Sequence, residues 1–137
     1  MALHPNLNAM LICDLTIREE RTGKVSLIGV FESIAATTFP TVHRALAVYA
    51  KLSDAEGEYD IRLELVRLDD ARTVAEGRMA AKFADRLTAA ELIFNLENLP
   101  FERPGRYEFR LHANDRFVAG KSFTVMQAPP APAAPPR

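Results

Sequence analysis

The chain has 137 residues, of which 48% are hydrophobic, and its formal net charge is −1 at pH 7. This length fits one domain, and the apolar fraction is large enough to bury a core without disulfides or a structural metal. The balanced charge argues against strong non-specific attraction to nucleic acid or to an anionic membrane.

A single cysteine, Cys13, rules out an internal disulfide, which fits a reducing compartment. The N-terminus lacks the basic and apolar regions of a secretory signal. No apolar run approaches the ~20 residues that a transmembrane helix needs. We therefore expect a cytoplasmic protein with neither a membrane nor a nucleic acid as its partner.

The first two predicted strands, 10–17 and 25–32, are nearly continuous apolar runs joined by a turn at Thr22-Gly23. They are typical of a hairpin that is more fully buried than the other strands. The next predicted strand, 44–52, follows a connection, 34–44, that carries little charge.

The middle of the chain alternates apolar and polar residues with the period of a strand. Residues 58–65 and 91–99 show this pattern clearly. Residues 73–83 are rich in alanine, but Gly77 would cost a helix about 1 kcal/mol. Their apolar positions fit a strand, so we predict one there.

Two further strands, 106–113 and 117–125, are predicted on either side of Asn114-Asp115, a pair that suits a tight hairpin turn. Tyr107 enters its strand two residues after Gly105. A tyrosine so placed often hydrogen-bonds to its own corner loop in immunoglobulin-like sandwiches.

The eight predicted strands favour an all-β fold. We expect a two-sheet antiparallel β-sandwich, immunoglobulin-like or a related Greek key, over residues 1–126. Residues 127–137 are rich in proline and alanine, which predicts a disordered tail.

No catalytic, cofactor-binding or metal-binding constellation stands out in the sequence. His4, His43 and His112 are far apart, and none has a partner at metal-ligand spacing. His112 is expected on the polar, solvated face of its strand. The six glycines are dispersed, so there is no phosphate-binding loop. The acidic pairs, among them Asp69-Asp70, fall in turns where solvated charge is normal.

Cys13 and Asp14 lie together in the most apolar strand and need separate interpretations. Burial would raise the pKa of Cys13, which makes it a packing residue rather than a nucleophile. Asp14 is expected on the outer face or capping a backbone N–H. If it were buried, its carboxylate would be a candidate for a functional group.

Phe39, Pro40 and His43 make the connection 34–44 a candidate recognition loop. It combines an aromatic ring, a rigid turn and an imidazole, and functional residues are frequent in such loops. The alternative is that Phe39 folds back and covers one end of the sandwich.

Several short segments of the chain carry a family resemblance: Cys13-Asp14, residues 22–31, Phe39-Pro40, residues 99–101 and residues 104–109. Together they resemble an uncharacterised bacterial family of small β-sandwich domains, a "domain of unknown function" family. The resemblance covers about residues 5–126 and implies a bacterial, cytosolic β-sandwich without transferable catalytic residues.

The leading functional hypothesis is a non-enzymatic protein-binding or scaffold module, with a protein partner or a second copy of the chain as its target. Sheet edges invite such pairing, and an exposed apolar face around Tyr49 and Ile93 would support it.

The alternative is a small-ligand or carbohydrate-binding sandwich, which would need a concave pocket with exposed aromatics such as Tyr49, Phe39 or Phe101. An enzyme would require Asp14, His43 or His112 to meet in one cleft.

Overall fold

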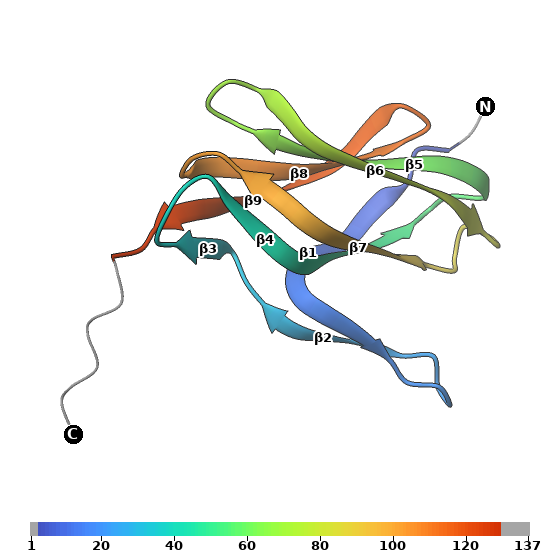
Figure 1. Ribbon diagram of the computed structural model, residues 1–137. Helices are drawn as coiled ribbons and strands as arrows, with labels where there is room; N and C mark the ends of the chain where they lie inside the picture. Colours follow the sequence, from blue (N-terminus) through green and yellow to red (C-terminus); the bar gives the residue numbers. More distant parts are fainter. Residues whose placement is uncertain (1–2, 130–137) are drawn as a thin grey trace.

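The computed structural model describes residues 3–129, which form nine β-strands (Figure 1). None of these residues lies in a helix that is long and apolar enough to cross a membrane. The predicted tail begins at the last residue of the final strand, and residues 130–137 lie outside the described part of the chain. The strands are β1 (Asn6–Arg18), β2 (Val25–Val30), β3 (Ser33–Ala36), β4 (Thr41–Ser53), β5 (Gly57–Arg67), β6 (Arg72–Phe83), β7 (Ala90–Phe101), β8 (Gly105–Ala113) and β9 (Arg116–Gln127).

The strands form two packed sheets, with the orders β2-β1-β4-β7 and β3-β9-β8-β5-β6. All neighbours pair antiparallel except β3 and β9, which run parallel. The fold is therefore an immunoglobulin-like two-sheet sandwich, as predicted. The ninth strand is β3, a short segment within the connection 34–44, where the sequence pattern predicts a loop.

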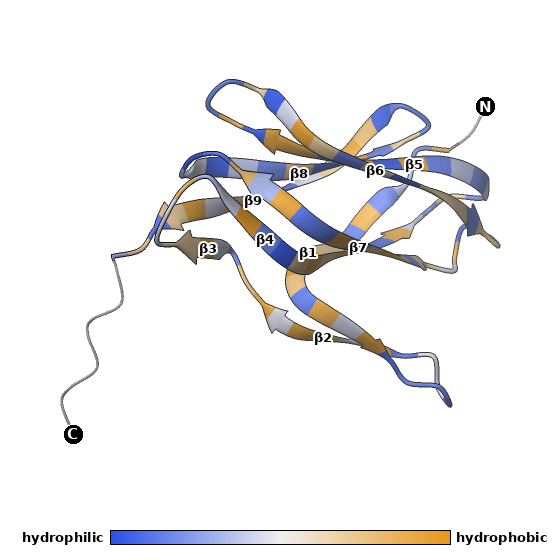
Figure 2. Cartoon of the chain, in the orientation of Figure 1, coloured by the Kyte–Doolittle hydropathy of each residue, from blue (hydrophilic) through white to orange (hydrophobic). Residues whose placement is uncertain are grey.

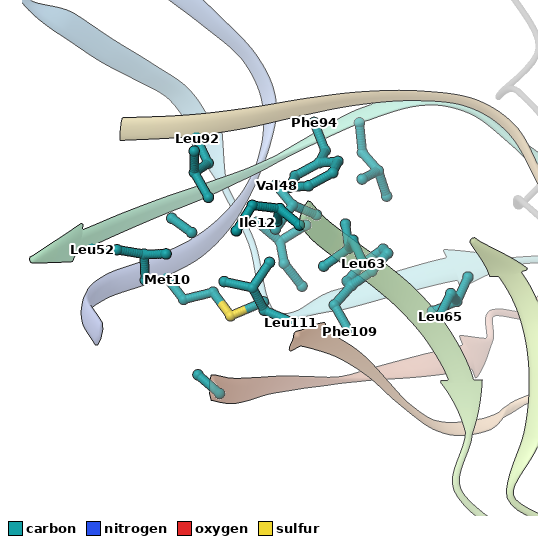
Figure 3. Packing of buried hydrophobic residues seen from close by; sticks show 14 of the residues in the cluster. Met10, Ile12, Val48, Leu52, Leu63, Leu65, Leu92, Phe94, Phe109 and Leu111 are labelled. Carbon is teal, nitrogen blue, oxygen red and sulfur yellow. The ribbon is translucent and has the colours of Figure 1, made fainter. Parts of the chain in front are cut away.

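The core lies between the two sheets and follows the alternation seen in the sequence. On β4, every second residue from Leu46 to Leu52 faces the interior and is nearly or fully buried. The facing sheet contributes Leu63 and Leu65 from β5 and Phe109 from β8 (Figure 3). Because the side chains of a strand alternate between its faces, the remaining positions of β4 face away from this core, although Ala47 and Tyr49 among them are also buried.

Two predicted turns are confirmed. Gly23 in the β1–β2 turn has a φ of +72°. Asn114 and Asp115 have φ values of 49° and 65°, the geometry of a two-residue turn that matches the twist of the β8–β9 hairpin.

The predicted tyrosine corner is also present. The Tyr107 hydroxyl donates a hydrogen bond of 2.8 Å to the Arg103 carbonyl. The ring is fully buried and meets Phe101 edge-on, with 4.9 Å between the ring centroids. This contact fixes the crossing from β7 to β8, a crossing between the two sheets.

A buried arginine lies beside that corner. Only 4% of Arg67 is exposed, and its guanidinium forms two bonds of 2.7 and 3.0 Å to the Asp70 carboxylate. Arg67 also lies 3.4 Å from Glu102, and Arg103 lies 3.0 Å from Asp69. Asp69 and Asp70 were expected to be solvated charges in a turn. Their ion pairs instead link the β5–β6 turn to the β7–β8 corner.

Replacing Tyr107 with Phe removes one hydroxyl bond from a buried corner. We expect the free energy of unfolding to fall by about 1 kcal/mol, because the Arg103 carbonyl loses its partner. Urea denaturation measures this difference. Tyr59→Phe is the matched control, since its hydroxyl bonds to the carbonyl of Leu3, ahead of the first strand, where water can replace it. An equal or larger loss in the control would contradict this role of the corner.

Replacing Asp70 with Asn tests the arginine network. The hydrogen bond from Arg67, and then the backbone N–H of Arg72, hold the pKa of Asp70 well below its usual range. Ionised Asp70 thus stabilises the fold above the unfolded pKa of about 4, and this is lost as pH falls through the lower folded pKa. We expect Asp70→Asn to lower the melting temperature at pH 7. The gap should close in acid, and a gap that persists unchanged there would contradict the ion-pair origin.

Candidate functional site

A hairpin arm leaves the sandwich after Cys13. Strand β1 pairs with β4 only over its first half, from Asn6 to Cys13. Beyond that point it pairs only with β2, from Leu15↔Ile28 to Arg18↔Val25. Residues 14–30, which we call the arm, project beyond β4 in the lower part of Figure 1.

The arm carries the most concentrated exposed apolar surface of its sheet. Leu15, Ile17, Ile28 and Val30 are each 44–52% exposed, and the hydrophobic colouring of this hairpin is visible in Figure 2. Leu15 lies opposite Ile28, and Val30 lies opposite Cys13. The prediction that this hairpin is more buried than the others is wrong for residues 14–30, because β1 no longer pairs with β4 there and β2 is the edge of its sheet.

Gly29 sets the shape of the arm at its base. Its φ is +69°, a conformation that residues with a side chain rarely adopt. A Cβ atom at this position would lie 2.3 Å from Oδ2 of Asp14. The Asp14 side chain therefore packs over the glycine and is exposed, so it is not the buried carboxylate considered above.

The tip of the arm is held by local hydrogen bonds. Glu19 accepts a bond of 2.8 Å from the backbone N–H of Thr22, and Arg18 donates one of 2.9 Å to the Gly23 carbonyl. The charged residues 18–24 thus form an ordered turn, and the apolar pairs lie between that turn and the sandwich.

The outer face of this sheet does not carry the expected apolar patch around Tyr49 and Ile93. Tyr49 is only 9% exposed, and its hydroxyl hydrogen-bonds to Glu91. Burial, followed by Glu91, raises the pKa of Tyr49 to about 12, while the nearby charge of Arg18 acts in the opposite direction.

Cys13 is a packing residue, as predicted. It is fully buried beside Ala47, with its thiol sulfur 3.7 Å from the Ala47 carbonyl oxygen. Burial first, and then the charge of Asp14, raise the pKa of the thiol, which makes it a poor nucleophile.

The candidate recognition loop is mostly taken up by β3 and β4. Phe39 is half-buried and packs against the core, so it covers an end of the sandwich, the alternative left open above. Pro40 is exposed. The imidazole of His43 lies near Phe31, with 6.0 Å between the ring centroids.

Asp14 and His43 meet at the base of the arm. They line two adjoining shallow hollows, of ≈ 350 and ≈ 760 Å³, and Ser33 lines the smaller one. Serine, histidine and aspartate here match a catalytic triad in residue type alone, because within residues 3–129 no hydrogen bond joins them.

His112 lies away from this place, on β8 in the other sheet. It is half-buried rather than solvated, with its Nε2 atom 2.8 Å from Glu64 and its ring edge-on to Phe117. The His112 imidazole is not oriented to form a hydrogen bond with Glu64. Among residues 3–129, no three His, Cys, Asp or Glu side chains cluster as metal ligands would.

Sequence reasoning missed the arm because an apolar strand has the same pattern whether it lies in a core or in an exposed interface. The available signal was the run Arg18–Lys24, whose charges place the distal end of the hairpin in water.

Comparison with known proteins identifies the family of the chain. A search of the curated proteins finds no match. The chain is similar to the crystal structure of an immunoglobulin-like protein from Pseudomonas aeruginosa. The identity is 14%, the match covers 90% of this chain and 97% of that one, and the TM-score is 0.43. The model of a family of unknown function, DUF6941, matches residues 8–126. The chain therefore belongs to the DUF6941 family.

Proposed function

We propose that this chain is a non-enzymatic protein-binding or scaffold module of the bacterial cytoplasm, and that it associates through its arm. The observation that carries the proposal is the set of four half-exposed aliphatic side chains on a two-stranded hairpin. An isolated two-stranded hairpin is only marginally stable in water. An apolar face on such an element is therefore stabilised by a surface that covers it.

The size of the apolar surface suits a reversible association. Covering the exposed half of four aliphatic side chains is worth roughly 3–6 kcal/mol per arm. Two arms paired edge to edge would gain at most twice that, because such pairing covers only part of each apolar face, against an association cost of at least ~4 kcal/mol. The balance favours a complex that forms and dissociates with concentration.

A second copy of the chain is the partner that the arm fits best. Strand β2 is an edge of its sheet, and its outer backbone groups can pair with another strand. Antiparallel pairing of β2 with itself about a twofold axis at Ile28 sets Ile28 against its own copy and Ser26 against Val30. Such a contact is isologous and therefore closes as a dimer.

The charges at the arm tip are compatible with that arrangement. Residues 18–24 carry both signs, including Arg18, Glu19, Glu20 and Arg21. In a twofold contact the tip of one arm approaches the base of the other, where Asp14 and Arg44 are exposed. Because both surfaces carry charges of both signs, opposite charges pair in one alignment of the two arms. This favours a defined register over non-specific adhesion.

Light scattering behind size-exclusion chromatography tests this function. We expect the full chain to show a concentration-dependent dimer, and Ile28→Glu to shift it towards monomer because a carboxylate would be buried in the contact. Leu87→Glu is the matched control. Leu87 is 96% exposed in the β6–β7 connection, outside the arm, so its replacement should leave the dimer unchanged.

A monomer at all concentrations would contradict self-association. A dimer that Ile28→Glu leaves intact would contradict the role of the arm.

A further inference from the structure

The chain leaves the last strand next to the smaller hollow at the base of the arm. The backbone N–H of Ala128 donates a hydrogen bond of 2.8 Å to the Ala36 carbonyl. The Gln127 side chain donates one of 3.2 Å to the Thr37 carbonyl. These bonds hold the chain after β9 at the end of β3, one residue from Ala35, which lines that hollow.

Strand β3 presents a free edge to the smaller hollow. It is the last strand of its sheet, with β9 as its neighbour on one side. The carbonyls of Glu32 and Ala36 accept hydrogen bonds from the chain of β9 and its continuation. Because backbone groups alternate in direction along a strand, those of Ser33 and Ala35 point to the free edge. Both residues line the hollow, so an extended segment lying there meets backbone N–H donors.

Two rings and a carboxylate complete the lining. Phe31 and His43 are both half-buried, and their ring centroids lie 6.0 Å apart with the planes inclined at 53°. Asp14 lines the hollow from β1 and is exposed. Among residues 3–129 it has no partner in an ion pair. The hollow therefore offers a ring-lined wall beside an uncompensated negative charge.

Residues 129–137 have a sequence that complements this lining. They read Pro-Pro-Ala-Pro-Ala-Ala-Pro-Pro-Arg. Pro132 and Pro135 have the spacing P-x-x-P, and Arg137 follows two residues later. Segments with this proline spacing bind aromatic-lined grooves as a polyproline II helix. Because proline has no N–H and its carbonyl still accepts, such a segment also suits an edge that presents N–H groups.

The reach of these residues matches the position of the hollow. A polyproline II helix rises about 3.1 Å per residue, so the segment from Ala128 to Arg137 spans about 28 Å. Strand β3, from Ser33 to Ala36, spans only about 10 Å. The segment is thus long enough to pass along β3, and Asp14 shares the hollow with Ser33.

We propose that residues 129–137 bind to the smaller hollow at the base of the arm of the same chain. The two prolines of the P-x-x-P segment lie against the two rings, and the guanidinium of Arg137 pairs with Asp14. This inference does not rest on the association of arms, because a contact within one chain is independent of protein concentration.

A spin label on the full chain tests the contact. Ala134→Cys places a thiol between the two prolines, and the native Cys13 is fully buried, so a nitroxide reagent reacts at position 134. We expect the label to broaden the amide NMR signals of residues 29–35 and 42–44, to the same extent at every protein concentration. Broadening confined to residues 36–40 and 126–128, where the chain leaves β9, would overturn the proposal.

A mixed sample separates a contact within one chain from a contact between two copies. Spin-labelled chain without ¹⁵N is mixed with ¹⁵N-labelled chain that carries no spin label. We expect no selective broadening at residues 29–35 in this mixture. Broadening there would overturn binding within one chain and assign the hollow to the tail of a second copy.

Replacing both Pro132 and Pro135 with Ala changes no residue of the sandwich and should abolish the selective broadening in the spin-labelled chain. Asp14→Asn should reduce the broadening about twofold, the size expected for an exposed ion pair. Asp115→Asn is the matched control, because Asp115 is exposed in the β8–β9 turn, at the opposite end of β9. Unchanged broadening in the double proline variant would overturn the role of the P-x-x-P segment, and unchanged broadening in Asp14→Asn would overturn the ion pair.

Discussion

Strand β1 pairs with two different neighbours along its length, and the break falls at Cys13. Up to that residue its backbone is bonded to β4 in the sandwich, and beyond it only to β2. The residues that follow cannot reach the core, so Leu15 and Ile17 lie near solvent despite their apolar character. The arm, its exposed aliphatic pairs and the hollows at its base all follow from this change of partner.

Two other places at the sheet edges carry features that limit pairing. Strand β3 covers β9 by parallel pairing, and on β7 the positive φ of Asn98 disturbs the regular edge. Bulges and short strands of this kind limit edge-to-edge pairing. Strand β2 carries only Gly29 near its end, and the proposed pairing runs across it from Ser26 to Val30.

Much of the fold could be predicted because alternation reports directly on half-buried strands. The pattern at 58–65, the turn at Asn114-Asp115 and the Tyr107 corner each depend on local chemistry that a sequence displays. The candidate site could not be predicted in the same way. Whether Leu15 and Ile28 are covered depends on which strand lies beside them. Local periodicity carries no information about such long-range placement.

Hydrogen exchange of the full chain at increasing protein concentration tests the central claim that the arm is the association surface. If two arms pair along β2, backbone amides within residues 26–30 gain hydrogen-bond partners, and exchange throughout residues 14–30 slows as concentration rises. Exchange in the core strand β5 should stay constant. An arm that exchanges at the same rate at every concentration would contradict the account.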